Sequence, residues 1–152
     1  MEIIKAQAEH FEIVKEITHQ TISEVYPHFY PKGVVDFFLA HHKNENIMKD
    51  IHSGDVYLLM DHDEAAGTVT INENEINRLF VLPSHQRKGY GRFLLDFAEK
   101  SIAEKYPAIE LSSSLPAREI YLKRGYIAME PRRIVVENGD VLCFDWMKKN
   151  CR

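Results

Sequence analysis

The fold is decided by the stretch Arg78-Leu79-Phe80-Val81-Leu82-Pro83-Ser84-His85-Gln86-Arg87-Lys88-Gly89-Tyr90-Gly91. An apolar strand runs into Pro83, which cannot donate to a ladder, and a tight loop then opens a long helix. The first backbone N–H groups of a helix have no intrahelical partner, and together with the helix dipole they favour an anion. Gly89 and Gly91 remove side chains that would hold the backbone away from phosphate oxygens.

Positive side chains surround the same loop, since Arg87, Lys88 and Arg92 lie in it or directly after it. Such a loop is typical of a diphosphate site, but a plain strand-to-helix connection with a solvated basic surface fits the spacing equally well. The Gly-Lys-Ser/Thr ending of a Walker loop is missing, and no third glycine completes a dinucleotide fingerprint. The residues alone therefore indicate an anion site without naming its ligand.

The apolar patterns on either side of the loop predict a mixed α/β layer structure in the order βααβββαβαββ. Strands are expected at 2–6, 56–60, 65–71, 75–82, 109–112, 126–129 with 133–136, and 141–146. Helices are expected at 8–25, 33–42, 89–106 and 116–124, with a further short helix around 47–51. Short polar turns imply antiparallel hairpins between the three central strands. No linker divides the chain, so residues 1–152 are expected to form one domain.

Composition limits the class of protein. The chain has 152 residues, is 45% hydrophobic and carries a formal net charge of -4, which disfavours non-specific binding to nucleic acid. Cys143 lies in an apolar run and is expected to be buried, and no cysteine or histidine cluster has metal-ligand spacing. There is no signal-peptide pattern, and the apolar runs are too short to span a bilayer. A cytoplasmic protein without metal is the expectation.

Two motifs carry a resemblance to a known family. The loop at 86–91 resembles the Gln/Arg-x-x-Gly-x-Gly/Ala motif of the GNAT superfamily of acyl-CoA-dependent N-acyltransferases. The run Ala117-Arg118-Glu119-Ile120-Tyr121-Leu122-Lys123-Arg124-Gly125-Tyr126 resembles that family's second signature, Ala-x-x-x-Tyr-x-x-x-Gly-Phe/Tyr. The order of elements fits as well, so the resemblance covers nearly the whole chain. It departs at Ser114, where the family often has asparagine.

The resemblance implies a central, mostly antiparallel mixed sheet flanked by helices and splayed at the strand that holds the cofactor. It implies acetyl-CoA or coenzyme A as co-substrate, with the pantetheine arm on the strand backbone and the pyrophosphate on main-chain N–H groups of the loop. The residues implied in cofactor binding are Phe80, Val81, Leu82, Arg87, Lys88, Gly89, Tyr90, Gly91, Arg92 and, despite the departure, Ser114.

The implied reaction is direct attack of a primary amine on the thioester. Tyr121 matches the family's general acid for the departing thiolate, and Glu75 matches a position where some members carry a carboxylate base. The N–H of Val81 is a candidate to polarise the thioester carbonyl. Tyr121 also fits ordinary core packing, and Glu75 also fits a solvated residue after a turn. An acyl-CoA-binding module that senses the ligand without chemistry is the alternative function.

The acceptor is left open by the sequence. The family's acceptor pocket lies among the first two helices and the last strands, and the aromatic residues there are Tyr26, His28, Phe29, Tyr30, Phe37, His41 and His42. His41 and His42 are expected to point to different sides of a helix. Arg78 suits either an acidic acceptor group or a structural ion pair. The partners implied are an acyl-CoA and a small-molecule or peptide amine, without nucleic acid or membrane, and a homodimer is common in the family.

Overall fold

The computed structural model describes residues 1–151, and its strands form a single seven-stranded sheet in the order β1-β2-β3-β4-β5-β7-β6. The strands are β1 (Glu2–Lys5), β2 (Val56–Asp61), β3 (Glu64–Asn72), β4 (Glu75–Val81), β5 (Ala108–Ser113), β6 (Ile127–Val135) and β7 (Val141–Asn150). The helices are α1 (Phe11–Val25), α2 (Lys32–His41), α3 (Asn44–His52), α4 (Tyr90–Ala103) and α5 (Arg118–Lys123), with 3₁₀ turns at Ala8–His10, Tyr26–His28 and Pro83–His85.

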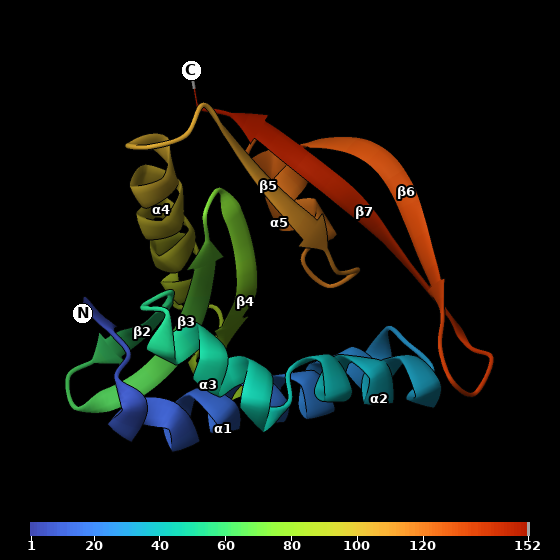
Figure 1. The fold of residues 1–152 in the computed structure, drawn as a ribbon, viewed down its shortest axis with the longest axis horizontal. Helices are drawn as coiled ribbons and strands as arrows, with labels where there is room; N and C mark the ends of the chain where they lie inside the picture. The colour runs from blue at the N-terminus through green and yellow to red at the C-terminus, as the bar shows by residue number, and fades with distance from the viewer. Residues whose placement is uncertain (152) are drawn as a thin grey trace.

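Helices cover both faces of the sheet, and each face has its own core. Neighbouring residues on a strand point to opposite faces, so Leu58 packs with the cluster under α1, α2 and α3, whereas Leu59 packs with the cluster under α4 and α5. In Figure 1, α1 to α3 lie together below the sheet and α4 stands beside β3. All strand pairs are antiparallel except β4 with β5. The expected fold class is confirmed.

The sheet splays between β4 and β5. These two strands pair in parallel at one position, Glu75 with Glu110, and then diverge. Asn74 holds this junction, because its carbonyl accepts the Glu110 N–H at 3.0 Å and its side-chain amide donates to the Ala108 carbonyl at 3.2 Å. From Ile76 onwards β4 has a free edge toward β5, as the family resemblance implied.

A β-bulge lies in β4 opposite β3. Thr68 pairs with Phe80 and Thr70 with Asn77, so two residues of β4 face one of β3. Arg78 occupies the bulge with φ of 46°, a left-handed conformation that costs a side-chain-bearing residue free energy. The bulge bends β4 directly before the loop and turns the Arg78 side chain into the gap below the splay.

The C-terminal hairpin differs from the expected pattern. One continuous strand, β6, replaces the two expected pieces, and it runs through Pro131. Proline has no N–H to donate to a neighbouring strand. It is tolerated in β6 because β6 is an edge strand, where one side of the backbone faces solvent and needs no ladder hydrogen bond. β7 is also longer than expected, and α5 and α4 are shorter. Figure 1 shows the β6–β7 arm extending toward α2, where the Asp140 side chain accepts the Gly33 N–H at 3.0 Å.

The expectation for Cys143 was wrong. The β7 strand alternates here, with Leu142 buried and Cys143 exposed, because the apolar run is a strand with one face toward the core. Within residues 1–151, none of the helices is long and apolar enough to cross a membrane.

Candidate active site

The loop after β4 presents backbone donors. Residues 86–89 form turns between the 3₁₀ turn Pro83–His85 and the first residue of α4, Tyr90. Arg87 and Gly89 have φ of 65° and 83°, and these left-handed conformations fold the loop tightly against the start of the helix. Within residues 1–151, none of the six backbone N–H groups from Arg87 to Arg92 donates a hydrogen bond. Such a run of free donors at a helix start is suited to a phosphate group.

The loop is fixed from two sides. The side-chain amide of Gln86 donates to the Val81 carbonyl at 3.0 Å, and the Leu82 N–H donates to the Ala66 carbonyl at 2.9 Å. The Tyr90 hydroxyl donates to the Asp61 carboxylate in the turn between β2 and β3. The donors are therefore held in place before any ligand binds.

Three cations lie around these donors. Arg87, Lys88 and Arg92 are exposed, and in the described part of the chain none of them has an acidic partner. Glu64 pairs with His85, and Asp61 pairs with His62, so neither carboxylate pairs with one of the three cations. The loop is therefore positively charged on its outer side.

The free edge of β4 continues from the loop toward the splay. Because the Leu82 N–H bonds to β3, and backbone groups alternate along an antiparallel ladder, Phe80 and Leu82 turn their N–H and carbonyl groups toward β3. Val81 turns its N–H to the open side. Of the three strand residues named from the sequence, Val81 alone offers a free backbone donor to a ligand in the gap.

A cavity of about 230 Å³ lies in the gap between β4 and β5. It is below the roughly 300–1,000 Å³ of pockets for drug-sized ligands. The residues that line it come from α2, β4, β5, α5 and the β6–β7 hairpin: Tyr26, Phe37, Phe38, His41, His42, Ile76, Asn77, Arg78, Leu79, Phe80, Ser112, Ser113, Ser114, Tyr121, Ile134, Leu142 and Phe144. The lining is aromatic and apolar with a few polar groups, and it contains no acidic residue.

Tyr121 enters this cavity from α5. Its ring packs edge-on against Tyr126 with centroids 5.5 Å apart, and its hydroxyl has no hydrogen-bond partner among residues 1–151. Every fully buried side-chain nitrogen or oxygen in that range has a partner, so the Tyr121 hydroxyl is open to the cavity. Burial raises the pKa of Tyr121 well above its usual value, which keeps the hydroxyl protonated.

Ser114 lies at the end of β5 and also lines the cavity. Its neighbour across the gap is Tyr26. Burial raises the pKa of Tyr26 to about 12, and Ser114 offsets part of this rise. Tyr30, which the sequence grouped with Tyr26, instead accepts the Leu115 N–H at 2.6 Å and braces the turn after β5. His28 and Phe29 are exposed and lie outside the lining.

Glu75 is not among the lining residues. It lies at the closed end of the splay, half-buried beside Glu110, and burial followed by that neighbouring charge raises the pKa of its carboxyl. The Asn77 side chain, which lines the cavity, offsets part of the rise in the Glu75 pKa, and its amide donates to Asn72 Oδ1 at 2.7 Å. The structure does not bring Glu75 and Tyr121 into direct contact.

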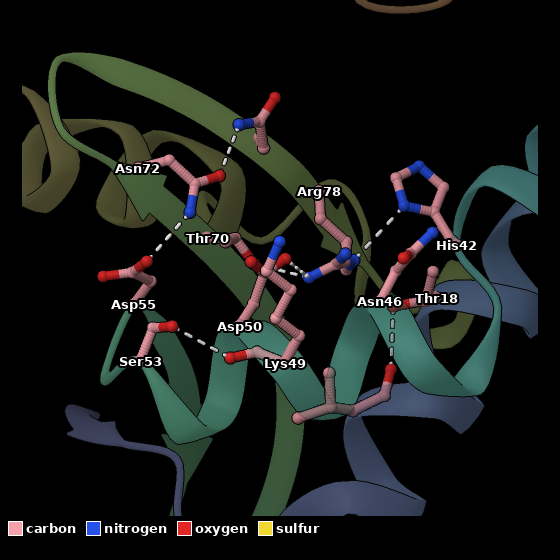
Figure 2. Close-up of polar contacts among 12 residues, drawn as sticks. Thr18, His42, Asn46, Lys49, Asp50, Ser53, Asp55, Thr70, Asn72 and Arg78 are labelled. Carbon is pink, nitrogen blue, oxygen red and sulfur yellow. Dashed lines mark hydrogen bonds and ion pairs between the residues drawn. The ribbon is translucent and has the colours of Figure 1, made fainter.

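Arg78 is the buried cation of the cavity. Its side chain pairs with Asp50 of α3 at 3.0 Å, donates from Nη1 to the Thr70 hydroxyl at 3.0 Å, and donates from Nε to His42 Nδ1 at 3.2 Å. Figure 2 shows the guanidinium held between these three side chains. The structural ion pair considered from the sequence is therefore present, and Arg78 still faces the cavity.

The two adjacent histidines do not point to different sides of a helix. α2 ends at His41, and His42 leaves helical geometry with φ of -103° and ψ of 43°, so both rings turn into the cavity with centroids 5.0 Å apart. Burial, then the Arg78 charge, lowers the pKa of His42 to about 3, and the same causes lower the pKa of His41. Both rings are neutral at pH 7.

Several lining residues were missed by sequence reasoning. Phe38, Asn77 and Phe144 carry no local signal that separates them from core or surface residues. Phe144 reaches the cavity only because β7 pairs with β5, and a pairing between segments so far apart in the chain leaves no mark in either segment.

Comparison with known proteins places the chain. Residues 25–149 match the family model described as an acetyltransferase (GNAT) domain. No curated protein sequence matches the chain at a significant level. A GCN5-related N-acetyltransferase structure from Rhodopseudomonas palustris superposes with a TM-score of 0.87 at 20% identity, covering 98% of this chain and 94% of that one.

Two further structures share the fold. The PaiA N-acetyltransferase of Thermoplasma acidophilum, in complex with coenzyme A, has a TM-score of 0.75 at 20% identity over 98% of both chains. The putative acetyltransferase YncA of Salmonella typhimurium, with its cofactor acetyl-CoA, has a TM-score of 0.76 at 14% identity, covering 100% of this chain and 94% of that one. The splayed sheet, the donor-rich loop and the family match agree, and the chain belongs to the GNAT acetyltransferase family.

Proposed function

We propose that the protein is an N-acetyltransferase that moves an acetyl group from acetyl-CoA to a primary amine by direct attack. The observation that carries the proposal is the run of six free N–H groups from Arg87 to Arg92, which opens beside the free edge of β4. Two proteins of the same fold hold coenzyme A or acetyl-CoA. The proposal takes residues 1–152 as one domain, because all seven strands join one sheet.

The donor binds along the loop and the strand. Backbone N–H groups of Lys88, Gly89, Tyr90 and Gly91 hold the pyrophosphate, and Arg87 and Arg92 add charge-assisted contacts. The pantetheine arm lies along the open edge of β4 as an added strand, next to Phe80 and Leu82. Ser114, on the opposite wall of the gap, lies where the arm passes.

The chemical step joins nitrogen to the acetyl carbon. Glu75 takes a proton from the ammonium, and the free amine attacks the thioester carbonyl. The Val81 N–H stabilises the oxygen of the tetrahedral intermediate. The carbon–sulfur bond then breaks, and Tyr121 gives its proton to the departing thiolate. As the bond breaks, the nitrogen loses its remaining extra proton to solvent. Solvent also takes the proton held by Glu75 and restores the proton of Tyr121, and the neutral amide and coenzyme A leave.

A thermal-shift comparison and a thiol-release assay test the proposal together. Coenzyme A and acetyl-CoA are expected to raise Tm, and ATP is expected to leave it unchanged. Across a panel of amines, at least one acceptor is expected to release free thiol and form an acetylated product. Stabilisation by coenzyme A without thiol release from any amine would instead identify a module that binds acyl-CoA without chemistry.

A further inference from the structure

Arg78 lines the cavity and has one nitrogen that no described residue engages. Arg78 is 8% exposed, and its Nε and Nη1 atoms are engaged by His42, Thr70 and Asp50. Its Nη2 has no partner within residues 1–151. Because no fully buried polar side-chain atom in that range lacks a partner, Nη2 is not fully buried, and Arg78 lines the cavity. Figure 2 shows Arg78 with its polar contacts to the neighbouring side chains.

His42 adds a second donor next to it. Arg78 Nε donates to His42 Nδ1, so Nδ1 carries no proton and the neutral ring carries its proton on Nε2. That Nε2–H has no acceptor in the part of the chain that the structure describes. Two donors from the same cavity wall therefore make no hydrogen bond to any described residue.

The positive charge in the cavity lining favours an acceptor that carries a negative charge. Arg78 is the one full charge in the lining, and no aspartate or glutamate accompanies it there. Asp50 lies on the other side of the guanidinium, where it pairs with Nη1. A polyamine or an aminoglycoside, with several positive charges, meets no carboxylate in this space, whereas an anionic group meets two free donors.

The other walls of the cavity indicate the polarity and size of the rest of the acceptor. They are apolar and mostly aromatic, with Tyr26, Phe37, Phe38, Phe80 and Phe144 around the space. The cavity volume of about 230 Å³ also has to admit the acetyl end of the donor, which leaves room for a compact molecule.

We propose that Arg78 binds a carboxylate of the acceptor, and that the acceptor is a compact apolar amine bearing that carboxylate, such as a free apolar amino acid. The inference rests on the proposed amine acetylation. Arg78 fixes the carboxylate, the aromatic walls take the side chain, and the amine is left to face the thioester.

Matched acceptors test the role of the carboxylate. The panel consists of leucine, leucinamide and isopentylamine, of phenylalanine, phenylalaninamide and 2-phenylethylamine, and of spermidine. With the wild-type protein, kcat/KM for leucine or phenylalanine is expected to exceed that of the matched amide and amine by at least ~100-fold, because a site built to bind a polar group rejects analogues without it. Equal or greater turnover of the amides, the simple amines or spermidine overturns the inference and leaves the acetyltransferase assignment standing.

Variants of Arg78 test whether this residue causes the preference for a carboxylate. Arg78→Met is expected to reduce the preference for the carboxylate to within a few-fold. Because this change leaves Asp50 without its cation, Asp50→Asn/Arg78→Met is measured beside it, and coenzyme A affinity by calorimetry reports whether each variant is folded. The control is Arg132→Met, an exposed arginine on β6 outside the cavity, which is expected to keep the wild-type preference. A folded Arg78 variant that keeps the preference overturns the inference.

A binding measurement separates the two proposals. N-acetylleucine and N-acetylleucinamide are titrated into the protein saturated with coenzyme A. Tighter binding of the carboxylate form, lost in Asp50→Asn/Arg78→Met, supports the inference even where no amine is turned over and the catalytic proposal fails. Equal affinity of the two compounds, or no binding of either, overturns it.

Discussion

Tyr121 and Tyr126 are neighbours with opposite surroundings. The Tyr126 hydroxyl donates to Glu99 Oε2 at 2.9 Å inside a network that also holds Arg124 and Lys149. The Tyr121 hydroxyl opens into the cavity without a partner in the described residues. A phenol that is protonated, buried and unengaged is suited to donate a proton once a substrate arrives. We therefore propose a chemical role for Tyr121 and a structural role for Tyr126.

Tyr121→Phe is expected to lower kcat by about 10²-fold or more, because the thiolate then leaves without a proton. KM for acetyl-CoA and Tm are expected to change little, since the hydroxyl makes no protein contact that stabilises the fold. Steady-state thiol release measures the first and a thermal scan the second.

Tyr126→Phe is the matched control for that prediction. It removes one hydrogen bond to a charged partner and is expected to cost about 1–3 kcal/mol of unfolding free energy, with kcat within a few-fold of wild type. Unchanged kcat in Tyr121→Phe contradicts the general-acid role.

Glu75 sets a pH dependence. Its carboxyl must be ionised to accept the amine proton, and burial beside Glu110 raises its pKa above the ordinary value of about 4.3. The acidic limb of the kcat profile is therefore expected above that ordinary value, with activity rising as pH rises through the raised pKa.

Glu75→Gln is expected to remove this limb and to lower kcat by about 10²-fold or more. A pH series of single-turnover rates with the same acceptor gives the measurement. Glu110→Gln is the companion variant, because losing the neighbouring charge moves the limb toward lower pH without removing it. If the limb persists in Glu75→Gln, another group is the base.

Individual residues show where sequence reasoning succeeds. Tyr121 lines the cavity, and its motif had indicated a place beside the cofactor, whereas its role as general acid stays a prediction. Cys143 and His42 were misplaced because exposure depends on which face a strand turns inward and on where a helix stops. The helix ends at His41, one residue before the expected end, and His42 leaves helical geometry with its ring in the cavity lining.

At the scale of elements, the loop and the start of α4 act as one binding unit. The backbone donors supply the geometry and the cations of Arg87, Lys88 and Arg92 supply long-range attraction. Because these side chains are solvated and unpaired in the described structure, each contributes less than a buried charge does.

Arg87→Gln/Arg92→Gln is expected to weaken coenzyme A binding by about 10-fold at low salt and by less at high salt, because solvent ions screen exposed charges. Tm of the free protein is expected to stay the same, since neither side chain has a partner among residues 1–151. Calorimetry at two ionic strengths checks both points. Lys32→Gln, whose lysine pairs with Asp36 away from the loop, serves as the control, and equal weakening there argues against a loop effect.

The elements themselves were predicted well where the pattern is local. The central strands and their hairpins follow from short apolar runs between polar turns. The unbroken β6 was missed because Pro131 is read as a strand terminator unless the strand is known to be an edge. The edge position is a property of the assembled sheet.

At the scale of the whole molecule, the order of the strands in the sheet could not be predicted from local sequence patterns. The parallel contact of β4 with β5, and the insertion of β7 between β5 and β6, join segments far apart in sequence. The family resemblance supplied the splay, and composition alone did not. The cavity is lined by residues of α2, β4, β5, α5, β6, β7 and the 3₁₀ turn Tyr26–His28. It follows from this order and therefore had to come from the structure.

Acid is expected to destabilise the whole protein through His42. Its folded pKa of about 3 lies below the ordinary value of about 6.5, so the unfolded chain binds more protons between these values. The unfolding free energy is therefore fully retained above pH 6.5 and falls by a few kcal/mol as pH drops toward 4. Arg78, His41 and His19 face the ring and add to the cost of charging it.

His42→Asn is expected to flatten this slope, because the amide still accepts a hydrogen bond from Arg78 but does not titrate. Urea unfolding at a series of pH values measures it. His52→Asn, an exposed histidine of α3, is the control and is expected to retain the wild-type slope. A wild-type slope in His42→Asn contradicts the assignment.

The single pairing of Glu75 with Glu110 leaves the sheet as two halves joined at one end. A donor that lies in the gap as an added strand contributes its binding free energy to the free energy of folding, about 2.7 kcal/mol at a concentration 100 times Kd. Amide protons of β4 and β5 then exchange more slowly when the donor is bound. The unliganded chain is therefore expected to be cleaved by proteases faster than the chain with bound donor.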